Sequence, residues 1–158
     1  ANPPIVLFCP GTRGSDGNLK DTYHNVSATG EFVINFVNAD NVEAMNITAV
    51  EAAPDVDEFE RVGLSTLPSK TIAVPRVAEA PIHFECKVHQ IVPAGDGYVV
   101  MGLVTYMHFS EAVFQEGNYI DPVALKPVGR LAGGSYAHIR DLFTLERPPS
   151  EIKPPTDN

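Results

Sequence analysis

The residues with the clearest capacity for chemistry lie in one short loop, Gly11–Thr22, which reads GTRGSDGNLKDT. Arg13 carries a planar guanidinium that can hold a carboxylate or phosphate through two hydrogen bonds, and Lys20 adds a point charge. The hydroxyl groups of Thr12 and Thr22 can donate further hydrogen bonds at short range. A loop with these side chains is typical of a site that holds a small anion.

The elements expected around this loop favour the same chemistry. An apolar strand, Ile5–Cys9, precedes the loop, and a helix, Leu19–Thr29 with Asn18 as its cap, begins inside it. The backbone N–H groups and the positive end of the helix dipole would then face the anion. A flexible polar turn beside a capped helix is the alternative, because the P-loop spacing and the dinucleotide-binding pattern G-x-G-x-x-G are both absent.

The rest of the chain predicts few helices and many strands. Short helices are expected from Asp40 and between Asp57 and Gly63, where each aspartate can cap the first turn. Strands are expected at 31–37, 70–77, 80–92 and 97–109, with the turn AGDG between the last two. This pattern indicates a mainly β fold, and a small barrel is preferred because a barrel leaves no exposed strand edges.

Alternation along the strand 80–92 separates two neighbouring residues. The inward face is expected to contain Ile82, Phe84, Cys86 and Val88. Glu85 then lies on the opposite face, and Cys86 behaves as a small core residue.

Composition excludes several classes of partner. The formal net charge is -9 for 158 residues, so the overall field repels nucleic acids and anionic membrane surfaces, and an anionic ligand must be small and held locally. The length suits one domain with one core. No apolar run has the length of a membrane span and no signal pattern is present, so a cytoplasmic location is expected. The histidines show no metal-like spacing, and no metal site is expected.

An ordered series of motifs resembles a known family. Residues 2–38, NPPIVLFCPGTRGSDGNLKDTYHNVSATGEFVINFVN, resemble the flavin reductase-like family of FMN-binding split barrels, with a Pro-Pro strand, a loop arginine, Lys-Asp-Thr, and a Gly-Glu-Phe-Val strand. The similarity continues in order through EAMNITA, DEFERVGL, VPRVAEAPIHFECKV, GLVTYMHF and DPVALKPVGRLAGGSYA. Each motif alone is weak, whereas the series covers nearly the whole chain.

The resemblance implies a fold and an activity. The fold is an FMN-binding split β-barrel, Greek-key-like, with a few short α-helices, which forms a homodimer. The activity is that of a flavin reductase, in which NADH or NADPH gives a hydride to FMN, and the reduced flavin is used in place or passed to an oxygenase component. The loop and the resemblance together predict these cofactor-binding residues: Gly11, Thr12, Arg13, Lys20, Asp21, Thr22, Arg130 and Tyr136.

For three residues later in the chain, a structural role is the alternative to a role in the site. Arg130 and Tyr136 lie in RLAGGSY, where they can flank a planar ligand, but a tight bend with Tyr136 packed in the barrel explains the same pattern. His108 matches a histidine of some family members and is the catalytic candidate. The alternative is a histidine at a strand end that bonds to backbone.

The resemblance also sets expectations for domain limits. Family members carry further strands before the Pro-Pro run, with a segment that lies along the flavin ring. We therefore expect residues 1–147 to form an N-terminally incomplete flavin reductase-like domain and residues 148–158 to form a Pro-rich tail. Two other functions stay open: a flavin-binding or carrier protein without catalysis, and a barrel interaction module that has lost the site.

Overall fold

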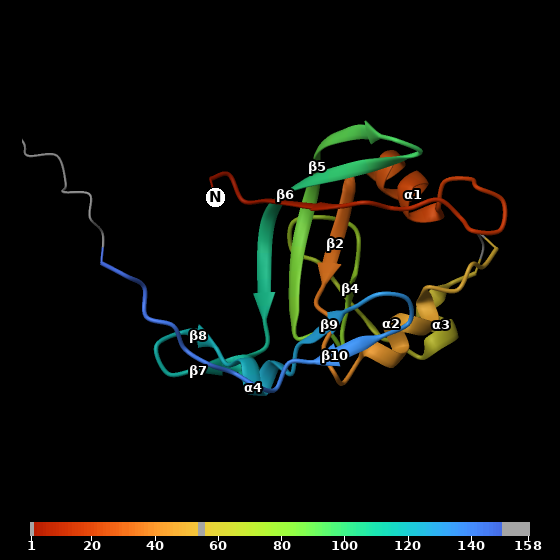
Figure 1. Ribbon diagram of the computed structural model, residues 1–158. Coiled ribbons are helices and arrows are strands. Elements are labelled where there is room, and N and C mark those ends of the chain that lie inside the picture. Colours follow the sequence, from red (N-terminus) through yellow and green to blue (C-terminus); the bar gives the residue numbers. More distant parts are fainter. Residues whose placement is uncertain (1, 54–55, 150–158) are drawn as a thin grey trace, which may run out of the picture.

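A four-stranded antiparallel sheet organises the molecule (Figure 1), and the computed structural model describes residues 2–53 and 56–149. The sheet has the order β1 (Ile5–Phe8), β6 (Gly97–Phe109), β5 (Ile82–Ala94), β2 (Glu31–Asn35). Three ribbons pair β3 (Thr66–Leu67) with β4 (Arg76–Val77), β7 (Phe114–Gln115) with β8 (Tyr119–Ile120), and β9 (Val128–Arg130) with β10 (Tyr136–His138). The helices are α1 (Asp21–Thr29), α2 (Val42–Thr48), α3 (Glu58–Val62), α4 (Pro122–Leu125) and the 3-10 helix η1 (Glu111–Val113).

The long hairpin of β5 and β6 forms at the predicted positions. Its turn lies at Ala94–Gly97, where Gly95 has a φ of 64° that residues with a side chain rarely adopt. The pairing shifts register after Glu85 and again after Val88. Such irregularities increase the local twist, and the turn end of the hairpin curls over α1 (Figure 1).

Two apolar clusters form the core. The first contains Val26, Phe32, Cys86 and Val100, and the second contains Ile82, Val113 and Leu125. The predicted inward face of β5 is confirmed, because Phe84 and Val88 pack against these clusters. Burial raises the pKa of the Cys86 thiol to about 11, as expected for a core residue. Each fully buried apolar side chain contributes about 1.5–3 kcal/mol, and these contacts fasten α1 and α4 to the sheet.

The first helix begins later than the sequence predicts. α1 starts at Asp21 with Lys20 as its N-cap, so the predicted cap Asn18 is wrong. The Arg13 N–H donates to the Asn18 carbonyl at 2.7 Å, and an isolated antiparallel bridge links Thr12 with the residue after Asn18. The loop is therefore closed as a short ribbon, and this backbone pairing holds its last residues in an extended conformation.

The caps of the next two helices differ in outcome. Asp57 accepts a hydrogen bond from the backbone N–H two residues later at 2.8 Å, and Gly63 ends α3 with a φ of 70°, as predicted. Asp40 does not cap α2, because the N-cap is Asn41 and the Asp40 carboxylate binds Lys126 Nζ at 3.0 Å. A residue distant in the sequence therefore determines the role of Asp40.

Most of the strand predicted at 70–77 is absent. Only Arg76–Val77 forms a strand, and residues 69–77, which we call the strap, lie against one face of the sheet. The Ala73 N–H donates to the Glu31 carboxylate at 2.8 Å, and the Val77 N–H donates to the Asn35 side chain at 3.0 Å. Side chains of β2 thus replace the neighbouring backbone that a strand would require.

These elements confirm a mainly β fold class with a few short helices. Within the described residues, no helix combines the length and the apolar character needed to cross a membrane.

Gly102 tests the packing of the sheet core. A Cβ at this position of β6 would lie 2.7 Å from Cε1 of Phe32 and 3.1 Å from Cβ of Cys86. We expect Gly102→Ala to lower the free energy of unfolding by about 1–3 kcal/mol because the core is overpacked, measured as a shift of the urea midpoint. Gly97→Ala in the same strand is the control, since its Cβ would meet nothing within 4 Å. Equal shifts for both variants would contradict this packing.

Candidate functional site

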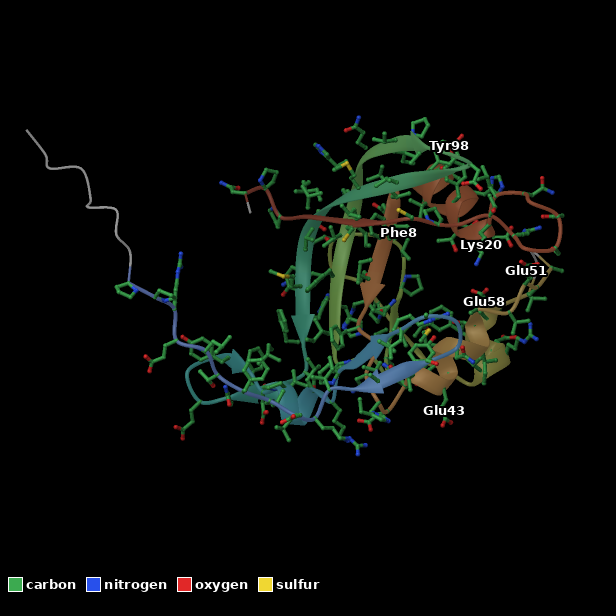
Figure 2. The ribbon with its side chains drawn as sticks, viewed as in Figure 1. Phe8, Lys20, Glu43, Glu51, Glu58 and Tyr98 are labelled. Carbon is green, nitrogen blue, oxygen red and sulfur yellow. The ribbon has the colours of Figure 1, made fainter. Side chains whose placement is uncertain are left out.

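A polar cleft of about 280 Å³ lies between the first loop and the connection from α2 to α3. The loop and α1 contribute Arg13, Lys20, Asp21, Thr22 and Asn25, and the facing side contributes Thr48, Ala49, Val50, Glu51, Ala52, Ala53, Val56 and Glu58. Figure 2 shows Lys20, Glu51 and Glu58 on this side of the molecule. Four predicted cofactor residues therefore line one cleft, whereas Gly11 and Thr12 belong to the same loop but lie outside its lining.

One cation of the cleft, Arg13, is paired with carboxylates of the protein. The Arg13 guanidinium donates to Asp21 Oδ1 at 2.6 Å and lies 3.9 Å from Asp16 Oδ2. This contact ties the loop to the first turn of α1. The position of Arg13 is set by Asp21, so the two predicted residues act as one unit.

The loop backbone already holds an anionic oxygen. The Gly14 N–H donates to Glu51 Oε1 at 2.6 Å, although the two residues are 37 positions apart. Hydrogen bonds from the Ser15 side chain and the Gly14 N–H lower the pKa of the Glu51 carboxyl. The exposed Glu51 carboxylate thus occupies the kind of position that the sequence predicts for an anionic ligand.

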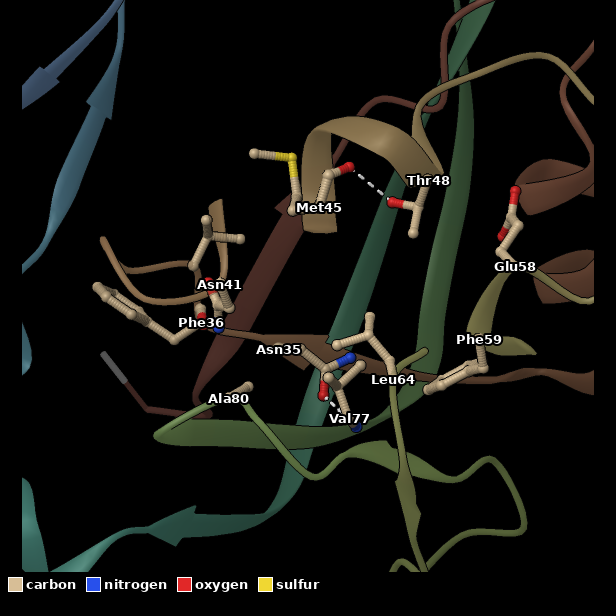
Figure 3. A pocket seen from close by; sticks show the side chains of 11 residues that line it. Asn35, Phe36, Asn41, Met45, Thr48, Glu58, Phe59, Leu64, Val77 and Ala80 are labelled. Atoms are coloured by element: carbon tan, nitrogen blue, oxygen red, sulfur yellow. Dashed lines mark hydrogen bonds between the residues drawn. The ribbon is translucent and has the colours of Figure 1, made fainter. Parts of the chain in front are cut away.

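An apolar pocket of about 260 Å³ adjoins the polar cleft (Figure 3). Its lining is Asn35, Phe36, Val37, Asn41, Met45, Thr48, Glu58, Phe59, Leu64, Val77 and Ala80. Thr48 and Glu58 line both cavities, and the Thr48 hydroxyl donates to the Met45 carbonyl at 2.7 Å. A charged cleft beside an apolar pocket suits a ligand with an anionic group and an uncharged group.

Arg130 and Tyr136 lie away from the polar cleft. They are partners on the β9–β10 hairpin, where Arg130 donates to the Tyr136 hydroxyl at 2.8 Å and to the Gly133 carbonyl at 2.7 Å. Tyr136 lines a different pocket, of about 380 Å³, which includes Val42 and Ile47 of α2. The structure therefore brings these two predicted residues to each other and not to Arg13.

His108 belongs to a second polar cluster, which the sequence analysis missed. The side chain of Glu85 is fully buried and accepts a hydrogen bond from His108 Nε2 at 2.5 Å. It also accepts from the N–H groups of Lys70 and Thr71 and from the Thr71 hydroxyl, each at 2.7 Å. The alternative expected for His108, a bond to backbone, is not what this geometry shows. The sequence contained one indication of this cluster: Glu85 is the acidic residue of the strand segment IHFECKV, and a buried charge requires partners.

The donors around Glu85 determine its ionisation. Burial opposes the charged form, but hydrogen bonds from His108, Thr71 and the Lys70 and Thr71 N–H groups outweigh burial and lower the pKa of the Glu85 carboxyl to about 2. Glu85 is therefore ionised at neutral pH and fastens the strap to β5 and β6.

No group of three histidine, cysteine, aspartate or glutamate side chains within residues 2–53 and 56–149 is placed to hold a metal ion.

The chain belongs to the flavin reductase like domain family, whose model matches residues 1–125. An uncharacterized protein of Halalkalibacterium halodurans is 38% identical over 154 residues, which cover 94% of this chain and 73% of that protein. Nitrilotriacetate monooxygenase component B from Bacillus cereus is 33% identical with a TM-score of 0.84, covering 91% of this chain and 73% of that one.

A third relative shows the fold alone. A protein with a split-barrel domain from Shewanella frigidimarina is 24% identical with a TM-score of 0.78, covering 92% of this chain and 72% of that one. The predicted split β-barrel is confirmed by this likeness, and family membership supports a flavin-related oxidoreductase role.

The buried Glu85 carboxylate predicts acid sensitivity. Its pKa of about 2 in the folded protein lies below the usual 4.5, so its contribution to stability is complete above about pH 5 and is lost as the pH falls toward 2. We expect Glu85→Gln to flatten this acid dependence and to lower the free energy of unfolding at pH 7 by about 2 kcal/mol, measured by urea unfolding between pH 7 and pH 3.

Glu51→Gln is the control for this measurement, because the Glu51 carboxylate is exposed. It should leave most of the acid dependence in place. An acid dependence that is unchanged in Glu85→Gln would show that this carboxylate does not stabilise the fold in the manner described.

Proposed function

We propose that this chain is an NAD(P)H-dependent flavin oxidoreductase that binds FMN with its phosphate in the polar cleft. One observation carries the proposal: the Gly14 N–H already holds a carboxylate oxygen at 2.6 Å in a cleft that Arg13 and Lys20 line. A phosphate offers the same type of acceptor with more charge and more oxygens.

The residues present fit such a group. Lys20 and Thr22 would contact the phosphate, and Arg13 would be held toward it by Asp21. The backbone of Gly11 and Thr12 would complete the loop around it. Because the Glu51 carboxylate has the same sign of charge, the phosphate would take its place on the loop rather than bind beside it.

Bound FMN would accept a hydride from NADH or NADPH, and the protein would bind and orient the two nucleotides. The adjoining apolar pocket provides a surface on which an uncharged ring can pack. Arg130 and Tyr136 stay a prediction for the ring side of the site, since Tyr136 lines another pocket and Arg130 donates to its hydroxyl.

The proposal includes partners. Large apolar side chains are exposed near the C-terminal end of the described chain, with Phe143 and Leu145 each 81% exposed, and this supports a homodimer in which they are covered. Similarity to a protein named as a monooxygenase component B supports transfer of reduced flavin to an oxygenase component. The cytoplasmic location stays a prediction.

Anaerobic reduction tests the activity. We expect the protein with bound FMN to lose its absorbance near 450 nm when NADH or NADPH is added without oxygen, because the flavin accepts the hydride. Stopped-flow absorbance measures the rate. Stable binding of FMN without bleaching by either nucleotide would instead show a flavin carrier. If the protein did not bind FMN, the remaining function would be that of a barrel interaction module that has lost the site.

Removal of the two cations tests the cleft. We expect Arg13→Ala together with Lys20→Ala to weaken FMN binding by roughly tenfold to a hundredfold and to leave riboflavin binding unchanged, because only FMN carries the phosphate. Titration calorimetry with both flavins measures the difference.

Two further variants control this titration. Lys87→Ala with Arg147→Ala removes the same charge from exposed positions outside the cleft and should have little effect. Glu51→Gln should act in the opposite direction and strengthen FMN binding, because it removes a competing carboxylate. Equal losses for FMN and riboflavin in the cleft variant would place the phosphate elsewhere.

A further inference from the structure

The Glu85–His108 pair has the geometry of an oriented acid–base group. Glu85 is an ionised, fully buried carboxylate, whereas the His108 side chain keeps 20% of its surface exposed. An ionised carboxylate only accepts hydrogen bonds, so the proton between the two groups belongs to His108 Nε2. In the neutral ring the lone pair must then lie on Nδ1.

His108 Nδ1 is available for a second partner. Among the described residues, no group forms a hydrogen bond with this nitrogen. Every buried side-chain nitrogen or oxygen of these residues has a hydrogen-bond partner, so a nitrogen without one is not buried. The nitrogen therefore has access to solvent or to a ligand. One end of the ring is held by the protein and the other end is open.

We propose that Glu85 is a positioning residue that holds His108 with Nδ1 turned outward, and that His108 exchanges a proton through Nδ1 in the reaction. The role of His108 rests on the flavin oxidoreductase function proposed above. That reaction consumes one proton besides the hydride: NAD(P)H, flavin and a proton give NAD(P)⁺ and the two-electron-reduced flavin. The His108 imidazolium supplies this proton from Nδ1 and keeps its Nε2 proton, which stays hydrogen-bonded to the Glu85 carboxylate. A proton from solvent then restores the imidazolium.

The groups around His108 explain why it needs this carboxylate. The rings of Tyr106 and His83 lie 4.7 Å and 5.9 Å from its ring. Lys70 donates to the Tyr106 hydroxyl at 3.2 Å, and Arg76 lies 3.3 Å from His83 Nδ1. These neighbours are cationic or neutral, and burial lowers the pKa of His83.

The negative charge of Glu85 therefore has two effects on the ring. It offsets the repulsion that the nearby cations exert on a protonated His108, and it selects the nitrogen that keeps its proton. A neutral amide at position 85 could do neither in the same way, because its NH₂ group can donate to Nε2 and reverse the tautomer.

The tautomer can be measured without any flavin. In protein labelled with ¹⁵N-histidine, long-range ¹⁵N–¹H spectra above pH 8 should show His108 with its proton on Nε2. Glu85→Gln should move His108 to the Nδ1–H form or to a mixture. Glu31→Gln should keep the Nε2–H form, because Glu31 holds the same strap through Ala73, whereas the carboxylate bonded to His108 is that of Glu85.

The spectra can overturn the proposal. An Nδ1–H tautomer in the wild-type protein would do so, and so would an unchanged tautomer in Glu85→Gln. If Glu85→Gln fails to fold, the tautomer of His108 in the wild-type protein decides whether the proposal stands. Thr71→Val then removes another donor to the Glu85 carboxylate and tests whether this loss changes the tautomer of His108. We expect Thr71→Val to keep the Nε2–H form.

The reaction supplies an independent measurement. We expect His108→Asn to lower kcat for flavin reduction about a hundredfold with little change in KM for the nicotinamide. Glu85→Gln should lower kcat less and move the alkaline limb of the pH profile to lower pH, because a protonated His108 loses its proton more readily without the negative charge. Glu31→Gln should match the wild type. Identical profiles for Glu85→Gln and Glu31→Gln would overturn the positioning role.

The two measurements separate failure of the inference from failure of the proposed function. If the wild type reduces no flavin, the oxidoreductase function and the proton-transfer role of His108 are both overturned. An Nε2–H tautomer that depends on Glu85 would still support the positioning of the ring by this carboxylate.

Discussion

A carboxylate removed from water must be surrounded by hydrogen-bond donors, and the Glu85 carboxylate meets this requirement by joining three parts of the chain. Its donors come from the strap and from the end of β6, while Glu85 itself lies in β5. The same four contacts place the strap against the sheet and orient His108. Without them, the Lys70 and Thr71 N–H groups would lose their partners, and the strap would lose part of its attachment to the hairpin.

The polar cleft solves a different electrostatic problem. A chain with a net charge of -9 repels an anion at long range, so attraction must come from donors at contact distance. Arg13 and the Gly14 N–H supply such donors, and the carboxylates of Asp21 and Glu51 occupy them. Internal anions hold the donors of the cleft in place. In the function proposed above, an external dianion would replace only Glu51, since Asp21 keeps Arg13 in position.

Fold and site support different conclusions about function. The split barrel and the family identify a flavin-related oxidoreductase, but a shared fold hosts many activities, and the reaction depends on particular side chains. In this chain the side chains proposed for the site lie in two groups, the cleft between the first loop and the α2–α3 connection and the Glu85–His108 pair on the hairpin. The first group has the chemistry for binding an anion, and the second has the chemistry for moving a proton.

Local patterns in the sequence were sufficient for the hairpin, for the core position of Cys86, for the Asp57 cap and for the gathering of Arg13 with Lys20. Strand alternation, turn residues and capping act over a few positions, so they can be read from the chain itself. The start of α1, the strap and the partners of Glu85 and Glu51 could not be read in this way. The decisive hydrogen bonds join residues 23 positions apart in Glu85–His108 and 37 apart in Gly14–Glu51, and only the folded chain brings such residues together.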